Sequence, residues 1–397
     1  MSYPQKEKNI FEKPPAVVVG LYLNGLDIVR ALSKNNIEVH ALEKDPNKPA
    51  VKTRLAQVHF TEDIEGPGLI QALLDLRKNF KADRKPVLFV TNDNIILRIA
   101  DNWPVLDGLY SLSWAHCRDT IRDLVIKANL HNYCERANIL YPRSYIINSA
   151  DDIPRIDSLL SRPFIAKPVR PLSKFKVKLL NSPSELRKLI DDYSSELPFL
   201  VQDHIPGEVK QQVFGIFYLR NGDMLAHFGV RKLATVSMGL GSATVAEPYE
   251  DEAVREEALR FFKGLNLSGP ASLELKRDKD GKLWAIEPTV GRPEYWNGFC
   301  IANGINFPYI EYCHQAGMEI PRYERTKRSV VWLDIERDPL CFFWFLRNEK
   351  LAIFKGGRRI VFSYFDKRDI RPFIEVMSTL IKNGIVSIGK RLAKIMS

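Results

Sequence analysis

Cysteine is scarce in the sequence and is arranged in no recognisable binding pattern. There is no CxxC pair and no cysteine–histidine spacing of the zinc-binding kind, so neither a disulfide framework nor a zinc site is indicated. The cysteines are an odd number and widely separated, at Cys117, Cys134, Cys300, Cys313 and Cys341. A reducing compartment fits this usage, and we expect the cytosol.

Long hydrophobic runs are also missing. The N-terminus, MSYPQKEKNIFEKPP, is polar and lacks the apolar core of a signal peptide, and the apolar run at 340–346 is too short to cross a bilayer. With 45% hydrophobic and 27% charged residues over 397 positions, the composition excludes a disordered or fibrous class. The length is enough for two or three domains with their own cores.

The positive charge is confined to one part of the chain. From Pro321 to the end there are 17 Lys and Arg against 8 Asp and Glu, which accounts for +9 of the net +10. We therefore expect no nucleic-acid partner. A helix is predicted over 371–384, and both it and the segment 385–396 are apolar on one side and basic on the other. Such a tail suits either peripheral contact with an acidic polymer or the inner face of a membrane, or packing on the body of the protein.

The first third of the chain alternates strands and helices. Strands are predicted at 16–20, 37–42 and 87–91, with a helix over 26–36, a pattern typical of a doubly wound parallel sheet. The loop GLYLNG (20–25) lacks the GxGxxG glycines of a dinucleotide site, which disfavours NAD. No Walker motif occurs in the sequence.

The middle of the chain changes from mixed to antiparallel structure. One helix is predicted over 119–136, a strand over 163–169, a helix over 184–193 and a strand over 198–205. Two hairpins are then expected, around Asn221-Gly222 and Asp280-Gly281. A two-residue turn at the second would place Glu274 directly opposite Glu287.

Two carboxylates so placed would have Cβ atoms about 5 Å apart and would repel each other. A cation is therefore expected between them, and Mg²⁺ prefers oxygen ligands of this kind. The alternative is a solvated pair neutralised by Lys276 or Arg277. A three-residue turn would shift the register and undo the pairing.

Two lysines lie in apolar surroundings. Lys167 interrupts the apolar strand PFIAKPV, where a lysine is rarely tolerated without an anion. Lys127 falls within the helix predicted over 119–136. The alternative interpretation is that Lys127 is a surface residue whose aliphatic stem is buried while its ammonium group reaches water. The segment FLVQDHIPGE (199–208) ends a strand with polar groups that can offer backbone hydrogen bonds to a flat heteroaromatic ring.

Five features follow one another along the chain: the lysine at 127, "IAKP" at 165–168, "LVQDHIPGE" at 200–208, "LELK" at 273–276 and "AIEPTVGR" at 285–292. In this order they resemble the ATP-grasp superfamily. The resemblance covers residues 14 to 320 and is nearest to the carboxylate–amine ligases. It implies ATP and Mg²⁺ as cofactors, with Mn²⁺ as an alternative metal. It also implies a role for each matching residue. Lys127 and Lys167 would contact the phosphates, Gln202 and the backbone of Asp203, His204 and Ile205 the adenine, and Glu208 the ribose. Arg231 or Lys232 would contact the γ-phosphate or a substrate carboxylate, and Glu274 and Glu287 the metal. Arg292 is expected to bind a phosphate or carboxylate, with an ordinary surface residue as the alternative. Trp296 and Asn297 are expected to line an amine pocket, with a plain core residue as the alternative for Trp296.

Two departures from the family pattern concern the metal and the triphosphate. Thr289 occupies the position where the family has an asparagine two residues after the second glutamate, so an altered metal geometry is expected. The triphosphate loop is normally rich in glycine but here reads RPLSKFKVK (170–178). Its backbone approaches phosphate less freely, and the side chains of Ser173 and Lys174 are expected to take its place.

The predicted architecture is α/β and α+β. A polar segment (1–13) precedes a Rossmann-like domain (14–117), the two lobes of an ATP-grasp fold (118–208 and 209–325) and a basic C-terminal extension (326–397). The expected activity is ATP-dependent amide formation from small carboxylate and amine substrates, such as amino acids or surface-polymer precursors, through an acyl phosphate. The alternatives are a non-catalytic ATP-binding sensor and an ATP-grasp kinase. A homodimer is compatible with the sequence, because dimers are the commonest oligomers.

Overall fold

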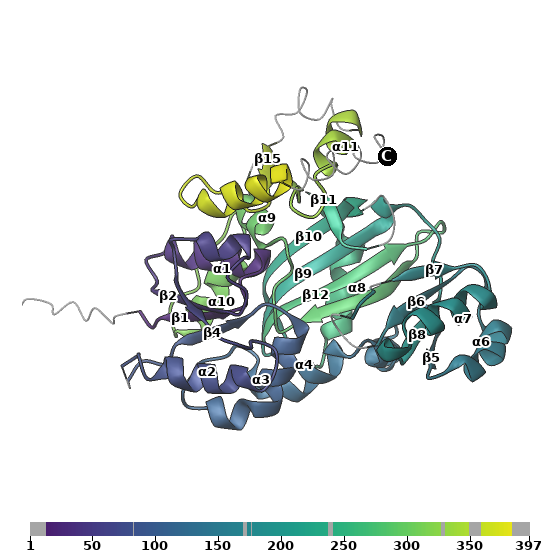
Figure 1. Ribbon diagram of the computed structural model, residues 1–397, viewed down its shortest axis with the longest axis horizontal. Helices are drawn as coiled ribbons and strands as arrows, with labels where there is room; N and C mark the ends of the chain where they lie inside the picture. The colour runs from purple at the N-terminus through teal and green to yellow at the C-terminus, as the bar shows by residue number, and fades with distance from the viewer. Residues whose placement is uncertain are drawn as a thin grey trace, which may run out of the picture.

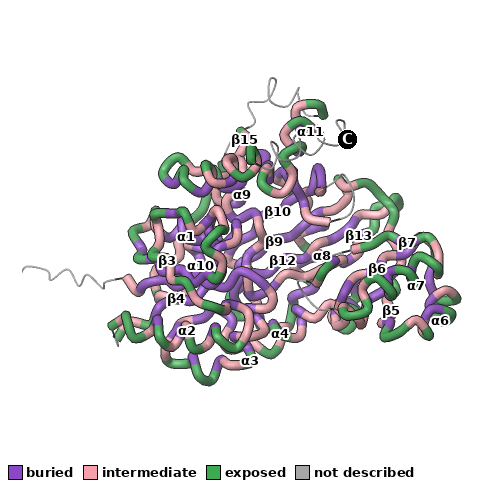
Figure 2. The backbone as a smooth tube through the Cα atoms, viewed as in Figure 1, coloured by how far each residue is buried: buried purple, intermediate pink, exposed green. Residues whose placement is uncertain are grey.

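The structure is a computed structural model that describes residues 13–81, 83–169, 173–175, 177–236, 241–326, 330–348 and 359–382. Its described strands form three sheets (Figure 1). Figure 2 shows that the strands in the middle of the molecule are largely buried, while exposed residues gather on the outer helices. None of the described helices is both long enough and apolar enough to pass through a lipid bilayer.

The N-terminal sheet is parallel, as predicted, with the strand order β3-β2-β1-β4. Residues Val17 and Val19 of β1 face α2 and α3, whereas Ala16 and Val18 face α1 and α10, so helices cover both faces. The bounds are β1 (Ala16–Val19), β2 (Val39–Glu43), β3 (Gln57–Phe60), β4 (Val87–Val90), α1 (Leu23–Ser33), α2 (Gly68–Arg77), α3 (Asp93–Leu106) and α10 (Phe307–Gln315).

The prediction of a single helix over 119–136 is wrong. It is two helices, α4 (Arg118–Val125) and α5 (Leu130–Ala137), separated by a 3₁₀ turn at Lys127–Asn129. The reason is local: the side-chain amide of Asn129 donates to the carbonyl of Asp123 at 3.1 Å and to its carboxylate at 2.7 Å, which ends α4. Lys127 therefore lies on a turn and not within a helix.

A small lobe follows with its own sheet, in the order β5-β8-β6-β7. Its core is separate from the rest of the molecule, whereas α4 and α5 pack in the core shared by the N-terminal sheet, β12 (Gly269–Arg277) and β13 (Leu283–Val290). Segment 118–137 thus belongs to the body and not to this lobe. The bounds are β5 (Ser144–Ile147), β6 (Phe164–Pro168), β7 (Lys178–Leu180), β8 (Phe199–Asp203), α6 (Ile153–Leu159) and α7 (Pro183–Asp192).

The largest sheet has the order β13-β12-β9-β10-β11-β14-β15 and crosses the centre of the molecule (Figure 1). Its bounds are β9 (Gln212–Arg220), β10 (Asp223–Thr235), β11 (Ala243–Pro248), β12 (Gly269–Arg277), β13 (Leu283–Val290), β14 (Val330–Leu333) and β15 (Arg359–Phe362). The accompanying helices are α8 (Glu252–Phe262), α9 (Asn297–Ala302), α11 (Cys341–Asn348) and a last helix over 371–382.

The C-terminal extension is built into the body of the protein. Strands β14 and β15 join the large sheet next to β11. Beyond them, Asp369 accepts hydrogen bonds from Arg30 of α1 at 3.0 Å and from Thr53 at 2.9 Å, both in the N-terminal domain. The helical prediction at 371–384 is confirmed over 371–382. The segment 385–396 lies outside the described residues.

The two hairpins have different outcomes. Asn221 and Gly222 both have positive φ, at 50° and 87°, and form the predicted two-residue turn between Arg220 and Asp223. The predicted two-residue turn at Asp280-Gly281 is wrong: Arg277 pairs with Leu283, and Asp278 accepts from Gly281 in a longer loop.

That longer turn shifts the register by one residue, and a second irregularity restores it. Leu275 pairs with Ala285, and a β-bulge then brings Glu274 opposite Glu287. The predicted pair of carboxylates is therefore confirmed, although the turn that was meant to produce it is not.

Candidate functional site

A cavity of about 420 Å³ lies between the small lobe and the large sheet. Strands β6 and β8 supply one wall, β12 and β13 supply the other, and the loop after β13 closes one end. Predicted site residues that line it are Lys127, Lys167, Ser173, Gln202, Asp203, His204, Ile205, Lys232, Glu274, Glu287, Thr289, Arg292 and Trp296.

The facing carboxylates each have a lysine partner. Lys127 Nζ lies 3.3 Å from Glu287 Oε1, and Lys232 Nζ lies 2.8 Å from Glu274 Oε1. Burial alone would raise the pKa of Glu287, but Lys127 and Lys167 outweigh it and hold this pKa at about 2. Both ion-pair partners come from outside the hairpin, so neither is Lys276 or Arg277, the residues of the alternative that the sequence left open.

Two further lysines carry charge into the cavity with no ion pair among the described residues. Lys167, on β6, and Lys276, on β12, approach it from opposite walls. Burial lowers the pKa of both side chains, although nearby glutamates oppose the shift. The nearby glutamates are already ion-paired with Lys127 and Lys232, and desolvated cations in excess of their carboxylate partners are the arrangement expected of an anion site.

The wall between these lysines is apolar and suits a flat ring. Ile165, Phe175, Val177, Phe214 and Ile286 line it. In the segment 202–205 at the edge of this wall, two side chains are already engaged within the small lobe. The amide of Gln202 donates to Ser144 Oγ at 2.7 Å, and Asp203 accepts from Arg143 Nε at 2.6 Å. The backbone N–H of Asp203 donates to the carbonyl of Arg143 at 3.0 Å, so the predicted adenine contact through residues 203–205 would use the remaining backbone groups and stays a prediction.

Arg292 reaches the cavity because the chain turns sharply before it. Gly291 has φ +72°, and its carbonyl accepts a hydrogen bond from the indole nitrogen of Trp114 at 2.8 Å. A Cβ at Gly291 would come within 2.9 Å of Ile121. Arg292 then pairs with Asp93 at the start of α3, 2.5 Å away, and Asp93 raises the pKa of Arg292 against the opposing effect of burial.

The loop after β13 is held from the N-terminal domain by Asn24. Its side-chain amide donates to the carbonyls of Thr91 at 2.9 Å and Pro293 at 3.3 Å. Asn24 belongs to the loop GLYLNG, whose likeness to a dinucleotide fingerprint was weak. The loop instead joins the first domain to the cavity wall.

Four predicted residues do not line the cavity: Arg231, Lys174, Glu208 and Asn297, the last of which is buried at the start of α9. Arg231 precedes Lys232 on β10, so it points to the opposite face, where it donates to Glu247 at 2.9 Å and stacks on Tyr249. Lys174 donates to Ser195 at 3.1 Å, and Glu208 caps the turn that follows it. Of the alternatives Arg231 and Lys232, the structure brings only Lys232 into the site.

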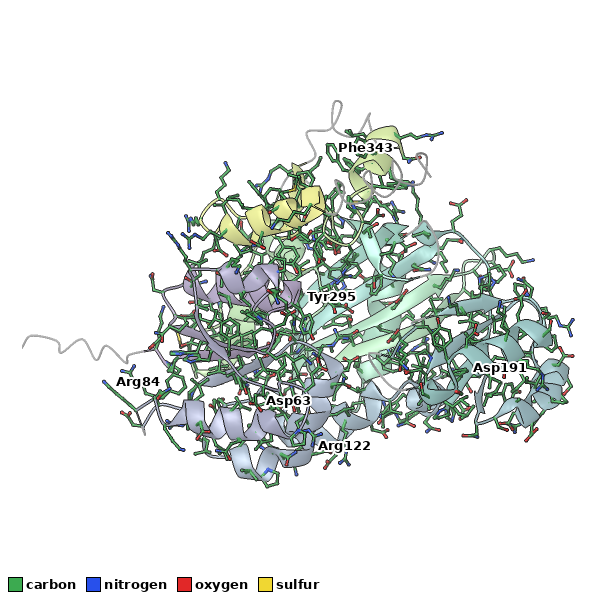
Figure 3. All side chains as sticks on the ribbon, viewed as in Figure 1. Asp63, Arg84, Arg122, Asp191, Tyr295 and Phe343 are labelled. Atoms are coloured by element: carbon green, nitrogen blue, oxygen red, sulfur yellow. The ribbon has the colours of Figure 1, made fainter. Side chains whose placement is uncertain are left out.

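Sequence reasoning missed Glu294, Tyr295, Trp332 and Arg337, which also line the cavity. With Asp93, Arg292 and Trp296 they form what we call the distal end, which meets the apolar wall where Trp296 packs edge-on against Phe214. Figure 3 places Tyr295 between the N-terminal domain and the large sheet. Glu294 stands two residues after Arg292 and could have been found from that spacing, whereas Arg337 lies in the extension and gave no signal.

The donors present fit a magnesium ion only if a nucleotide supplies the remaining ligands. No group of three or more Asp, Glu, His or Cys side chains placed to hold a metal is found in the described residues. Glu274, Glu287 and the hydroxyl of Thr289 offer oxygens alone, and Mg²⁺ is commonly held by one or two carboxylates together with phosphate oxygens.

No family model and no curated protein matches the sequence. Solved structures do match its fold. N5-carboxyaminoimidazole synthetase from Staphylococcus aureus complexed with ADP has a TM-score of 0.67 at 15% identity, covering 84% of this chain and 86% of that chain. The Aspergillus clavatus synthase in complex with ADP and 5-aminoimidazole ribonucleotide has a TM-score of 0.63 at 14% identity, covering 80% and 81%.

A third match is the biotin carboxylase domain of Hydrogenobacter thermophilus 2-oxoglutarate carboxylase, in complex with MgADP, ADP and bicarbonate. Its TM-score is 0.64 at 13% identity, and the match covers 79% of this chain and 72% of that one. These matches cover between 79% and 84% of this chain. The chain therefore has the ATP-grasp fold that its motifs resemble.

Proposed function

We propose that this protein is an ATP-dependent ligase that joins a carboxylate to an amine through an acyl phosphate. The observation that carries the proposal is the pair Glu274 and Glu287, facing each other on β12 and β13 with lysines on both sides. The fold adds support, because the matched synthetases and the carboxylase were crystallised with ADP.

The nucleotide would occupy the end of the cavity nearest β6 and β8. Its adenine would lie against the apolar wall and bond to the backbone of residues 203–205, and its phosphates would meet Lys127, Lys167 and Lys276. Glu274, Glu287 and Thr289 would hold Mg²⁺, which in such reactions neutralises charge that develops on the phosphates. Ser173 remains a predicted phosphate contact at the mouth of this end.

In the reaction, one carboxylate oxygen of the acid attacks the γ-phosphorus, the bond to the β-bridging oxygen breaks, and ADP leaves. The amine then attacks the acyl carbon and displaces phosphate. Lys127, Lys167 and Lys232 would stabilise charge on the transferred group, and Arg292 would hold the acid. No nucleophile from the protein is needed, because positioning and charge stabilisation supply most of the catalysis.

The direct test is ADP formation across a panel of amino acids, hydroxy acids and uronic acids, repeated with hydroxylamine. A hydroxamate product is expected with the correct acid, since hydroxylamine traps an acyl phosphate. Glu287→Gln should abolish the product, and the exposed Glu319→Gln should retain it.

Two other results would replace the proposal. ADP formation that needs an alcohol and yields a phosphate ester would identify a kinase. Nucleotide binding without turnover under every condition would identify a sensor.

We also infer that the C-terminal part of the chain contacts an anionic surface. The support is that Leu340, Phe343, Ile374 and Ile381 are between 56% and 69% exposed within the most basic region, and Phe343 projects outward from α11 (Figure 3). Co-flotation with vesicles containing phosphatidylserine, lost in a Leu340→Ser/Phe343→Ser variant, is expected. Equal binding of both proteins would refute the contact.

A further inference from the structure

Helix α1 carries a stripe of polar side chains on the face that it buries. Asn24, Asp27 and Arg30 follow one another at intervals of three residues, so they lie on one side of the helix in neighbouring turns. None of the three is more than 8% exposed. A helix face that packs against a core is usually apolar, and buried polar groups need hydrogen-bond partners. The stripe therefore specifies what α1 packs against.

Two of the partners belong to the segment after β13. The side-chain amide of Asn24 donates to the carbonyl of Pro293 at 3.3 Å, and Asp27 accepts from the backbone nitrogen of Gly298 at 2.7 Å. A Cβ at Gly298 would come within 2.8 Å of the Asp27 carboxylate, so the helix and the segment are in close contact. Two hydrogen bonds from one helix thus fix both ends of the segment 293–298.

The residues between these two anchors line the cavity. Glu294, Tyr295 and Trp296 all do so, and Arg292 directly precedes the first anchor. Because hydrogen bonds are directional as well as attractive, the anchors set where this stretch of backbone lies. The position of the distal end is therefore tied to α1.

The contact of Asp27 with the segment does not depend on its charge. Burial raises the pKa of Asp27 to about 7, against the lowering effects of Arg30 and of the Gly298 N–H. Both the protonated and the ionised carboxyl keep an oxygen that accepts from Gly298. An asparagine at this position keeps one as well.

Arg30 connects the same helix to the C-terminal extension, at the turn before the last helix (Figure 1). It donates to the carboxylate of Asp369 at 3.0 Å and to the carbonyl of Tyr364 at 2.9 Å. Asp369 is buried and also accepts from Thr53 Oγ1 at 2.9 Å and from the backbone nitrogen of Arg54 at 3.3 Å. Removing one partner of such a buried pair leaves an uncompensated charge, which is strongly destabilising.

The extension leads from this anchor back to the cavity. Next to Tyr364, Ser363 Oγ donates to the fully buried Asp334 at 2.9 Å. Asp334 lies 3.3 Å from Nε of Arg337, and the guanidinium of Arg337 stacks over the ring of Tyr295, its central carbon 4.0 Å from the ring centroid. Tyr295 is thus held from two sides, by the anchors on α1 and by the extension that α1 itself holds.

We propose that α1 and the C-terminal extension form a clamp that holds the segment 293–298 in the position needed to bind the acid substrate at Arg292. The inference rests on the proposed function. Asp27 holds the segment directly, and Asp369 holds it through the extension and Arg337. Since Asp27 and Asp369 do not line the cavity, both are positioning residues and act on the reaction only through the residues that they hold.

Steady-state kinetics of hydroxamate formation on the full-length protein test the direct contact, with the acid and ATP varied in turn. Asp27→Ala should lower kcat/KM for the acid about tenfold, the effect of losing one hydrogen bond, while KM for ATP changes by less than about twofold. Asp27→Asn keeps the acceptor for Gly298 and should behave like the wild type.

The control removes a buried hydrogen bond elsewhere in the same domain. Tyr110 donates to the carbonyl of Leu73 at 2.7 Å, in the core on the other face of the N-terminal sheet. Tyr110→Phe should leave the kinetic constants for both substrates unchanged.

Asp369→Ala tests the indirect contact. This variant leaves Arg30 buried without its counter-ion and should show the same selective loss for the acid, although Asp369 lies outside the cavity. Asp369→Asn keeps an acceptor oxygen and removes only the charge, and it gives the same comparison if Asp369→Ala does not fold.

Amide hydrogen exchange reads the clamp without turnover, because exchange reports local opening of the backbone. Peptides that cover 293–300 would be followed by mass spectrometry. We expect faster exchange there in Asp27→Ala and Asp369→Ala, and wild-type exchange in Asp27→Asn and Tyr110→Phe.

The clamp and the ligase fail in different ways. Unchanged exchange at 293–300, or losses that fall equally on the acid and on ATP, overturns the clamp, while hydroxamate formation by the wild-type protein leaves the ligase standing. Absence of hydroxamate with every acid overturns the ligase and the substrate role of the clamp together, even if exchange changes as expected. Faster exchange with a selective loss for the acid supports both.

Discussion

The two ends of the cavity are built in different ways. At the nucleotide end, Lys167, Glu274, Lys276 and Glu287 all lie on strands, and the register of β12 against β13 places Glu274 opposite Glu287. At the distal end, Asp93, Arg292 and Arg337 come from the start of α3, the loop after β13 and the loop after β14. The first end is a product of local pairing, and the second is a product of packing between segments far apart in the chain.

Removing a charge from the nucleotide end should have the largest effect. Lys167→Ala is expected to weaken binding of an ATP analogue by about 10²-fold or more, the usual effect of losing a buried charged contact. Calorimetric titration measures it, and Lys188→Ala on the exposed face of α7 is the matched control. Unchanged affinity in Lys167→Ala would mean that the phosphates lie elsewhere.

The corresponding change at the distal end should spare the nucleotide. Arg292→Ala is expected to lower kcat/KM for the acid by about 10²-fold, as for loss of one electrostatic contact in a transition state. Steady-state kinetics with the acid and with ATP varied in turn would separate the effects. A parallel loss of ATP affinity would show that the two ends are one site and that the comparison is false.

Glu311 is a buried acid where the N-terminal domain meets the large sheet, and its ionisation should affect the stability of the protein rather than its activity. Glu311, on α10, is buried with Ser113 Oγ as its hydrogen-bond partner at 2.6 Å, and burial raises its pKa from 4.5 to about 8. Because the folded state holds this proton more tightly than the unfolded state, Glu311 costs increasing stability as the pH rises from 4.5 to 8.

Glu311→Gln should therefore raise the free energy of unfolding at pH 8 and change it little near pH 4.5. Urea denaturation at the two pH values tests this. If the variant is equally or more destabilised at pH 8, the carboxyl is ionised and has a partner that it needs.

The smallest effect separates backbone strain from close packing. Gly291→Ala and Gly281→Ala both place a Cβ at positive φ, +72° and +82°, at a cost of roughly 1–2 kcal/mol. Only Gly291 also meets Ile121 and Trp114, whereas no atom lies within 4 Å at Gly281. Gly291→Ala should therefore unfold at lower urea concentration than Gly281→Ala, and equal midpoints would show that the turn before Arg292 has room to relax.

The same contrast explains what the sequence could predict. Lys167 was recognisable because a charge interrupts an apolar strand, and the parallel N-terminal sheet because strands and helices alternate. The pair Glu274 and Glu287 was predicted from a two-residue turn that does not exist. The longer turn and the bulge shift the register in opposite directions, and neither is visible in the hydrophobic pattern, because a bulge adds a residue without changing the strand's composition.

Neither the helix break at Ile126 nor the position of Arg337 could be predicted from the sequence, and the causes are related. The break depends on the side chain of Asn129 folding back on Asp123, which competes with the helix at a site of otherwise helical periodicity. Arg337 enters the cavity because β14 joins the large sheet beside β11, a contact between strands some 80 residues apart in the chain. The basic extension, predicted as an appendage, therefore supplies part of the site.

The central claim is that an acid is activated as its acyl phosphate, and oxygen transfer measures this directly. An acid that supports ADP formation would be labelled with ¹⁸O in both carboxylate oxygens, and the phosphate released during amide formation analysed by mass spectrometry. The account predicts one ¹⁸O atom in each phosphate, with ADP as the other nucleotide product. Unlabelled phosphate, or AMP and pyrophosphate in its place, would contradict it.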